Sequence, residues 1–232
     1  MSKKALIIWG GWDGHTPYPS SLMAMDLLEE EGYDVEMENS LQPYTDHKRL
    51  NSLDLLIQCW TQGSLEDDEI MMTKGGTKNL QNAVMDGLGF AGWHGGINDS
   101  FRRDTEYQWF MGSQWVAHPG GVVDFEVNIV PEKKDDPIVK GLNDFKLKSE
   151  QYYCHLDPGI IEGINGEVLA TTKFKHPYGD WNDVVMPFVY KRWWGDGKIF
   201  YAAYGHTFND FNVPEAVEIL KRGLLWATRD ET

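Results

Sequence analysis

The sequence predicts an α/β fold built on a mostly parallel sheet. Three short apolar runs, at 5–9, 54–60 and 88–93, have the length and composition of strands that are buried on both faces. Helical patterns separate these runs along the chain. Strands and helices that alternate at this spacing are typical of parallel sheets with right-handed crossover connections.

The expected elements of the first half each have their own start and stop signals. A helix that follows Ser20 and Ser21, either of which could cap it, is expected to stop at Gly32. The alternating run 34–39 predicts a strand. A second helix over 66–84 starts with acidic residues, which suit the positive end of its dipole, and the pair Gly75-Gly76 inside it predicts a break.

The second half of the chain favours antiparallel strands, which would extend the parallel sheet. We expect a helix over 101–110 and an amphipathic helix that Pro214 opens. Alternating or apolar patterns predict strands at 123–130, 145–153, 168–172, 186–194 and 198–204. The tight turn 195–197 would join the last two strands as a hairpin. The sequence contains no repeat and no linker, so residues 1–232 are expected to form one domain.

The charge of the chain argues against several classes of partner. Its 232 residues include 36 Asp and Glu against 21 Lys and Arg, which gives a formal net charge of −15. Such a surface repels phosphate backbones and anionic lipids, so neither nucleic acid nor membrane is expected as a partner. The apolar run near the N-terminus is too short for a signal sequence or a membrane span, and we therefore expect a cytoplasmic protein.

The cysteines and tryptophans carry weaker information. Cys59 and Cys154 are too few for a secreted disulfide framework, and Cys59 lies in an apolar run where a buried thiol is expected. Ten tryptophans are many for this length, and exposed tryptophans can stack on sugars or pack in interfaces. Trp193 and Trp194 could belong to a homo-oligomer interface, but a hairpin packed on its own domain would have the same pattern.

The stretch 87–96 contains the most informative turn in the sequence. The strand predicted at 88–93 leads into Gly92-Trp93-His94-Gly95-Gly96. In α/β hydrolases a Gly-x-nucleophile-x-Gly turn presents Ser or Cys at the top of the sheet. Here the same frame presents His94. An imidazole at this position could act as a base or bind a metal ion, or it could simply hydrogen bond within a tight turn.

Several other polar or aromatic side chains follow predicted strands. Ligands bind beyond the carboxyl ends of the strands in open α/β sheets, so these side chains could meet at one edge. The candidates are His15 and Trp12 after the first strand, Trp60 after the third, His206 after the last, and Glu150 and Tyr152 in the middle of the chain. The sequence has no local metal-binding motif, and a metal site would have to be assembled from His15, His94 and His206 with Glu150.

These motifs together resemble the trehalose-utilisation (ThuA-like) family, whose fold is similar to that of class I glutamine amidotransferases. The resemblance runs through most of the chain. The matching features are the glycine-rich loop with His15, the turn at 92–96, AHPGG followed by VDFEVNIV, DDPIVKGLNDF, Glu150-x-Tyr152, and GKIFYAAYGHTFNDF with the following helix. The sequence departs from the family at Asp136, where His is common, and at Ser149, where an acidic residue is frequent.

The resemblance implies a flavodoxin-like three-layer α/β/α sandwich and a lost nucleophile. His94 occupies the position at which the amidotransferases carry Cys, so glutamine hydrolysis by a thiolate is not expected. The family is associated with the uptake and breakdown of disaccharides, including keto-sugars made by a partner dehydrogenase. Some of its members resemble metal-binding proteins.

Two functional hypotheses follow for this chain. In the first, it is an enzyme that acts on a disaccharide or keto-sugar with His94, Glu150 and His206 as catalytic groups. His15, His94 and His206 could also hold a divalent metal such as zinc, although no cofactor is certain. Trp12, His15, Trp60, Trp93 and Tyr152 would bind the sugar. In the second hypothesis, the chain is a non-catalytic sugar-binding or regulatory module. A plain esterase or amidase is disfavoured, because His94 fills the one elbow-like turn.

Overall fold

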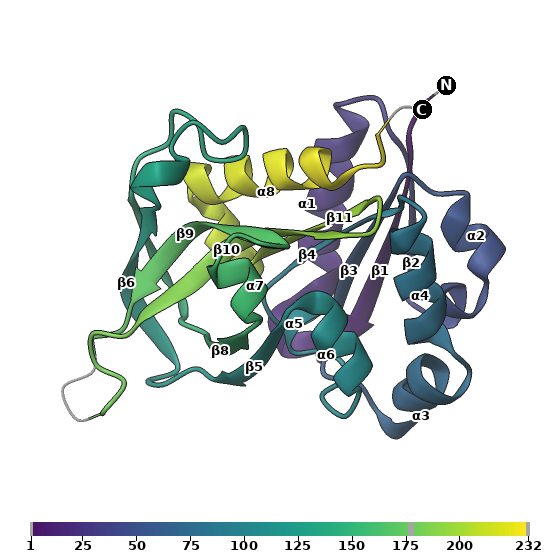
Figure 1. Ribbon diagram of the computed structural model, residues 1–232, viewed down its shortest axis with the longest axis horizontal. Helices are drawn as coiled ribbons and strands as arrows, with labels where there is room; N and C mark the ends of the chain where they lie inside the picture. Colours follow the sequence, from purple (N-terminus) through teal and green to yellow (C-terminus); the bar gives the residue numbers. More distant parts are fainter. Residues whose placement is uncertain (1, 176–178, 231–232) are drawn as a thin grey trace.

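The computed structural model describes residues 2–175 and 179–230, and it shows three layers with a sheet in the middle (Figure 1). Helices α1 (Pro17–Glu29) and α8 (Pro214–Ala227) pack on one face of the sheet. The other face is covered by α4 (Gly76–Met85), α5 (Gly95–Asn98) and α6 (Thr105–Met111). This arrangement confirms the predicted three-layer α/β sandwich.

The main sheet has nine strands and divides into a parallel and an antiparallel half. The parallel half, in spatial order, is β2 (Asp34–Glu38), β1 (Lys4–Gly11), β3 (Leu55–Thr61), β4 (Gly89–Trp93) and β11 (Gly197–Ala202). The antiparallel half continues with β10 (Val185–Trp194), β9 (Gly166–Lys173), β6 (Val122–Ile129) and β7 (Phe145–Glu150). The predicted mixture of parallel and antiparallel strands is therefore confirmed.

Strand direction brings distant parts of the chain to one edge of the sheet. Each antiparallel step reverses the strand, so β9 and β7 run in the same direction as β11. The carboxyl ends of β1, β3, β4, β11 and β7 therefore lie at the same edge. The hydroxyl of Ser149 in β7 contacts Asp210, which follows β11. Since three strands, β10, β9 and β6, lie between β7 and β11, the antiparallel half must curl back toward that edge.

The central strands are apolar because helices cover both of their faces. Leu6, Ile7, Leu56 and Ile57 in β1 and β3 are all 0% exposed, which explains the continuous apolar runs in the sequence. One polar side chain, Gln58, is buried among them. Its amide nitrogen donates to Gly96 O, Ser100 Oγ and Tyr107 OH, and its oxygen accepts from Tyr44 OH. These bonds tie β3 to the turn that follows β4.

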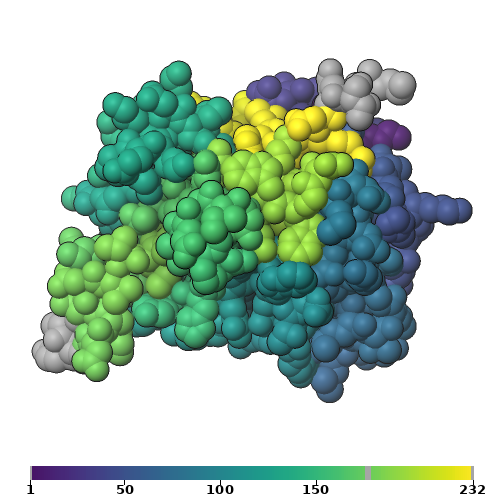
Figure 2. Space-filling view, viewed as in Figure 1, coloured from purple at the N-terminus to yellow at the C-terminus, as the bar shows by residue number. Residues whose placement is uncertain are grey.

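The remaining elements are short. They are α2 (His47–Asn51), α3 (Leu65–Asp68), α7 (Pro158–Ile161), the π-helical turn Glu69–Thr73 and several 3₁₀ turns. Strands β5 (Ser113–Ala117) and β8 (Tyr153–Leu156) form a separate two-stranded sheet. No helix within the described residues is long and apolar enough to cross a membrane. In the space-filling view, the yellow helix α8 lies along the upper edge, above the boundary between the green and the blue segments (Figure 2).

Three sequence-based expectations differ from the structure, and a fourth, the break in a helix, is confirmed. Helix α1 starts at Pro17, and Ser20 and Ser21 are buried inside it rather than capping it. The helix expected over 101–110 starts only at Thr105, because Asp104 caps it. The helix expected over 66–84 is broken as predicted, with Gly75 in the left-handed region at φ 81°. The strand expected over 145–153 is two strands, β7 and β8, in different sheets.

Candidate functional site

His94 lies on a strained turn between β4 and α5. Its backbone has φ 46° and ψ −138°, a conformation that non-glycine residues rarely adopt. The turn matches the strand-to-helix geometry that presents a nucleophile in α/β hydrolases. The His94 backbone N–H donates to Ala202 O at 2.7 Å, which fastens the turn to the end of β11. The elbow that the sequence pattern predicted is therefore present, with an imidazole at its tip.

The glycines around His94 are needed because neighbouring backbones approach closely. A Cβ atom on Gly92 would lie 2.5 Å from Gln58 O, and one on Gly96 would lie 2.8 Å from Cys59 Cα. A Cβ atom on Gly95 would instead meet side chains, 2.6 Å from His15 Cε1 and 2.8 Å from Tyr152 OH. Two of the glycines thus fit the turn against β3, and the third leaves room for the groups that surround His94.

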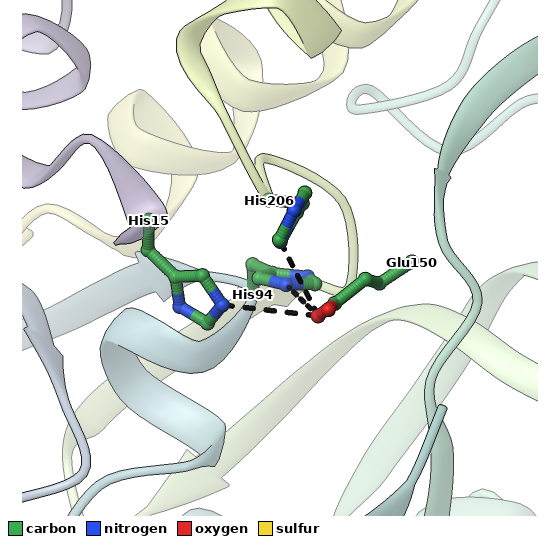
Figure 3. Close-up of side chains that lie close together, drawn as sticks. All are labelled: His15, His94, Glu150 and His206. Atoms are coloured by element: carbon green, nitrogen blue, oxygen red, sulfur yellow. Dashed lines mark hydrogen bonds and ion pairs between the residues drawn. The ribbon is translucent and has the colours of Figure 1, made fainter. Parts of the chain in front are cut away.

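Three histidines and one glutamate meet at this edge of the sheet. His15, His94, Glu150 and His206 are drawn together in Figure 3, and we call them the His/Glu cluster. They come from the loop after β1, the turn after β4, the end of β7 and the loop after β11. One ligand atom from each residue lies within 4.8 Å of those of all the others. The structure therefore brings together all four residues that the sequence proposed as a possible metal set.

A single carboxylate oxygen lies at the centre of the cluster. Glu150 Oε2 is 3.2 Å from His94 Nε2, 3.3 Å from His206 Nδ1 and 3.7 Å from His15 Nε2. The three imidazole rings pack edge to face, with centroids 4.7–5.4 Å apart. The ring of Tyr152 stacks on His94 at a centroid distance of 3.9 Å. These contacts leave the rings little freedom to turn away from Glu150.

Neighbouring groups fix the orientation of the rings. His15 Nδ1 hydrogen bonds to Thr61 Oγ1 at 2.8 Å, and His94 Nδ1 donates to Ala203 O at 2.9 Å. The carboxylate of Asp210 accepts from the backbone N–H groups of Gly205 and His206, at 2.8 and 3.0 Å. These contacts resemble the outer partners that orient metal-binding histidines in many proteins.

Burial gives the cluster unusual acid–base properties. His94 is 1% exposed, and its burial lowers the pKa of the imidazole to about 4, so His94 is neutral at pH 7. Burial opposes ionisation of Glu150, but its contacts with His15 and His206 hold the pKa of the carboxyl well below its usual range. The cluster therefore combines neutral His94 with an ionised carboxylate.

The cluster has the composition and spacing of a metal site. A neutral His94 that donates from Nδ1 to a carbonyl has only a lone pair on Nε2, and that lone pair faces Glu150 Oε2. His206 Nδ1 is buried and makes no aligned hydrogen bond to any described residue. Four ligands on a tetrahedral zinc ion are about 3.4 Å apart, given metal–ligand distances near 2.1 Å. The three distances to Glu150 Oε2 are 3.2, 3.3 and 3.7 Å, close to this spacing, and all four ligand atoms lie within 4.8 Å of one another. The residues therefore fit such an ion after the histidine rings draw slightly closer together.

The aromatic residues expected to bind a sugar differ in their accessibility. Trp12 is 47% exposed, and its ring contacts that of His15 at a centroid distance of 4.8 Å. Trp60 is half-buried beside Asp67. Tyr152 is 1% exposed and lines the cluster from one side. Trp93 is a core residue, 1% exposed and packed against Phe211, and it therefore offers no surface to a sugar, contrary to the expectation from the sequence.

His118 lies beside the cluster, although no sequence pattern assigned it a definite role. Its Nε2 lies 3.7 Å from Glu150 Oε1, whereas the other three histidines contact Oε2. Its ring lies nearly parallel to that of Tyr152, and its side chain is 38% exposed. The signal that could have identified it is its place in the AHPGG segment, which was part of the family resemblance. His118 is thus the most accessible imidazole near the cluster.

Other reactive side chains lie away from the cluster or are shielded. Cys59 and Cys154 are buried free thiols, and burial raises the pKa of each to about 12. Neither cysteine lies at the elbow. His155 is exposed on β8, and His47 lies in α2, while His176 falls outside the described residues. Trp193 is 39% exposed and contacts Trp226, and Trp194 packs between Trp109 and Phe110, so self-association stays a prediction.

Known structures share the fold of this chain. A protein described as ThuA-like from Bacteroides uniformis is 17% identical, with a TM-score of 0.76, and the match covers 97% of this chain and 91% of that one. A second, from Parabacteroides merdae, is 18% identical, with a TM-score of 0.70 and coverage of 100% and 93%. A β-galactosidase from Bacillus circulans sp. alkalophilus is 14% identical, with a TM-score of 0.58, and the match covers 97% of this chain but 30% of that one.

The family assignment rests on a match along almost the whole chain. No curated protein sequence is significantly similar to this one. The family described as ThuA, trehalose utilisation, matches residues 4–227. This span includes all four members of the His/Glu cluster. The chain therefore belongs to the ThuA family.

Proposed function

We propose that the protein is a metal-dependent enzyme that acts on a disaccharide or keto-sugar at the His/Glu cluster. The family supports a carbohydrate-related role of the trehalose-utilisation type. The observation that carries the more specific proposal is the pair His94 Nε2 and Glu150 Oε2, 3.2 Å apart. Two lone pairs that face each other in a buried site repel, and a cation between them would turn that repulsion into coordination.

The four residues of the cluster share one role in the proposed reaction. His15, His94, His206 and Glu150 would hold a divalent ion such as zinc. Such an ion, when bound, polarises a carbonyl or hydroxyl oxygen and stabilises negative charge that develops there. His94 is too deeply buried to touch a sugar, since it is 1% exposed and both of its ring nitrogens face protein atoms. We therefore assign His94 to ion binding rather than to proton transfer.

More accessible groups around the cluster would hold the sugar. Trp12 offers an exposed aromatic face next to His15, on which a sugar ring can stack. His118 offers a hydrogen-bonding imidazole on the opposite side of Glu150. His118 lies outside the set that would hold the ion, and 38% of its side chain is accessible, so it is the candidate to exchange a proton with a bound sugar.

Metal content and turnover together test this proposal. The parent protein, His94→Ala, Glu150→Gln and the surface control His155→Ala would be purified without a tag and analysed for bound elements. We expect about one divalent ion per chain in the parent and in His155→Ala, and little in the other two variants. Turnover of disaccharides and of their keto derivatives, followed by mass spectrometry, should follow the metal content.

The competing function is a sugar-binding or regulatory module without catalysis. The Cys nucleophile of the amidotransferase-like fold is replaced by His94, and such a replacement is compatible with binding alone. Saturable sugar binding, with neither bound metal nor turnover in the parent protein, would favour this second function and reject the first.

A further inference from the structure

One buried tyrosine beside the His/Glu cluster lacks the hydrogen bond that the other buried tyrosines make. Six tyrosine side chains in the described part of the chain are at most 1% exposed. In four of them the hydroxyl donates to a protein oxygen at 2.5–2.9 Å, and in a fifth it accepts from an amide; these are Tyr44, Tyr107, Tyr190 and Tyr204, and Tyr201. The hydroxyl of Tyr152 has no hydrogen-bond partner among residues 2–175 and 179–230.

An unpaired hydroxyl is unusual at this depth. A buried hydroxyl costs free energy unless it is hydrogen bonded, and most buried polar atoms in proteins are paired. A phenol keeps its proton at neutral pH, so the hydroxyl of Tyr152 is a hydrogen-bond donor. An acceptor that comes from outside the chain would satisfy it.

The hydroxyl of Tyr152 faces the cluster. The tyrosine ring stacks on that of His94, with centroids 3.9 Å apart. A Cβ atom on Gly95 would lie 2.8 Å from Tyr152 OH and 2.6 Å from His15 Cε1, so the hydroxyl and the His15 ring lie on the same side of Gly95. Glu150, two residues before Tyr152, brings its carboxylate to the same histidines. A ligand that binds at the cluster would therefore meet this hydroxyl.

The ring of Tyr152 offers a ligand much less than the hydroxyl does. The side chain is 1% exposed, and the imidazole of His94 covers one face of the ring. Trp12, by contrast, is 47% exposed and presents a free aromatic face. The sequence predicted both residues to bind a sugar. The structure supports stacking for Trp12 and a hydrogen bond for Tyr152.

A donor that is held in place acts most strongly on an oxygen atom that becomes negatively charged. The ring of Tyr152 is held between that of His94 and that of Trp115, whose centroid lies 6.0 Å away. A donor fixed in this way does not have to reorient while charge develops. Removal of one such donor from an enzyme commonly lowers kcat by about 100- to 1,000-fold.

We propose that the Tyr152 hydroxyl donates a hydrogen bond to an oxygen atom of the ligand at the His/Glu cluster and stabilises the negative charge that this oxygen gains during the reaction. Tyr152 is then a catalytic residue, and it keeps its own proton throughout. This inference rests on the proposed function, in which the ligand reacts at the cluster.

Two tyrosine-to-phenylalanine variants test the proposal first through stability. Tyr152→Phe removes the unpaired hydroxyl and keeps the ring on His94, so its melting temperature should stay close to that of the parent. The matched control, Tyr190→Phe, removes a buried hydroxyl that is bonded to Met111 O and Ser113 Oγ. The control should melt at a lower temperature, because it leaves both partners unpaired.

Ligand binding is the second measurement. The probe is acetohydroxamate, whose two oxygen atoms coordinate divalent ions, and it is titrated by calorimetry into samples loaded with zinc to the same content. We expect Tyr152→Phe to bind the probe at least tenfold more weakly than the parent, and Tyr190→Phe to bind it as the parent does. For a sugar that the parent converts, Tyr152→Phe should lower kcat by a larger factor than it raises KM.

Two results would overturn the proposal. If Tyr152→Phe melts as far below the parent as Tyr190→Phe does, the hydroxyl already has a partner in the protein. If the zinc-loaded parent and Tyr152→Phe bind acetohydroxamate equally, or neither binds it, the hydroxyl meets no ligand oxygen at the cluster. When the parent holds zinc and converts a sugar, this second result contradicts the role of Tyr152 and leaves the proposed function standing.

A parent protein that does not hold zinc contradicts the proposed function instead. Trehalose then replaces acetohydroxamate as the probe of the same two variants. Weaker binding of trehalose by Tyr152→Phe than by the parent and Tyr190→Phe would support the hydrogen bond to a ligand without the metal-dependent reaction. Equal binding by all three proteins would overturn the assignment of Tyr152 as well.

Discussion

The hydroxyl of Ser149 donates a 2.5 Å hydrogen bond to the carboxylate of Asp210, and this contact joins the two ends of the candidate site. Ser149 directly precedes Glu150 in β7. The same carboxylate oxygen of Asp210 accepts from the backbone N–H groups of Gly205 and His206. One buried side chain therefore sets the position of both Glu150 and His206.

Asp210→Ala is expected to weaken metal binding without touching a ligand. The substitution leaves two backbone N–H groups and the Ser149 hydroxyl without their acceptor, so the loop that carries His206 should shift. We expect metal affinity, measured by competition with a chelator, to fall about 10- to 100-fold. Asp210→Asn, which keeps an acceptor oxygen, should recover part of the loss, and the exposed Asn212→Ala is the control. Unchanged affinity in Asp210→Ala would show that other contacts position the loop.

Alanine at two adjacent glycines should have different consequences. A methyl group on Gly95 would press on the buried rings of His15 and Tyr152, so Gly95→Ala should displace these rings and lose metal, with a smaller loss of thermal stability than Gly96→Ala. A methyl group on Gly96 would press on the backbone of Cys59, and Gly96→Ala should be destabilised by about 1–3 kcal/mol. Thermal unfolding and elemental analysis of both variants test this contrast, which equal losses of stability would contradict.

The metal-free protein should lose stability in acid through His94. Its pKa is lowered from 6.5 to about 4 in the folded state, so between these values the unfolded chain binds the extra proton. The contribution of neutral His94 to the free energy of unfolding, roughly 3 kcal/mol, is complete above pH 6.5 and is lost as the pH falls to about 4. Urea unfolding at several pH values measures it. His94→Gln should show a shallower fall over this range, and His155→Ala should follow the parent. If the free energy of unfolding falls equally with pH in His94→Gln and in the parent, His94 is not the cause of the loss of stability in acid.

The two cysteines should not react in the native protein. Since burial raises the pKa of Cys59 and of Cys154 to about 12, both remain protonated thiols at pH 8. A thiol reagent such as DTNB should label fewer than a tenth of the sites in the folded protein within minutes, and both sites after denaturation in urea. Rapid labelling of one thiol in the folded state would mean that a reactive thiolate is present, which would reopen thiol-based chemistry.

Local patterns were sufficient to predict the central part of the fold. Apolar runs identified β1, β3 and β4 because helices cover both faces of these strands. The glycine frame around His94 identified the elbow because only a turn with a close backbone approach needs glycine at positions such as Gly92 and Gly96. Helix α8 was found from Pro214, which starts it, and from its apolar face.

Features that depend on distant contacts were not predictable in the same way. Trp93 was expected to meet a sugar, but Phe211 covers it, and no pattern near Trp93 indicates that contact. The division of 145–153 into β7 and β8 depends on the pairing of β8 with β5, a strand that no local pattern had indicated. Glu150 was expected near the histidines because side chains at the carboxyl ends of strands can meet at one edge of the sheet. Its side chain reaches them, however, only because the antiparallel half of the sheet curls back toward that edge.

The curl that brings Glu150 to the histidines also sets the order in which the protein can mature. His15 and Glu150 belong to opposite halves of the sheet, and their approach closes a long loop of chain. Contacts of such separation form slowly, after the local helices and hairpins have formed. A half-folded chain would hold at most some of the four ligands, and an ion that needs all of them would bind only when folding is complete. Bound metal would then mark a finished molecule, and a newly made chain without its ion would be the form most exposed to proteolysis.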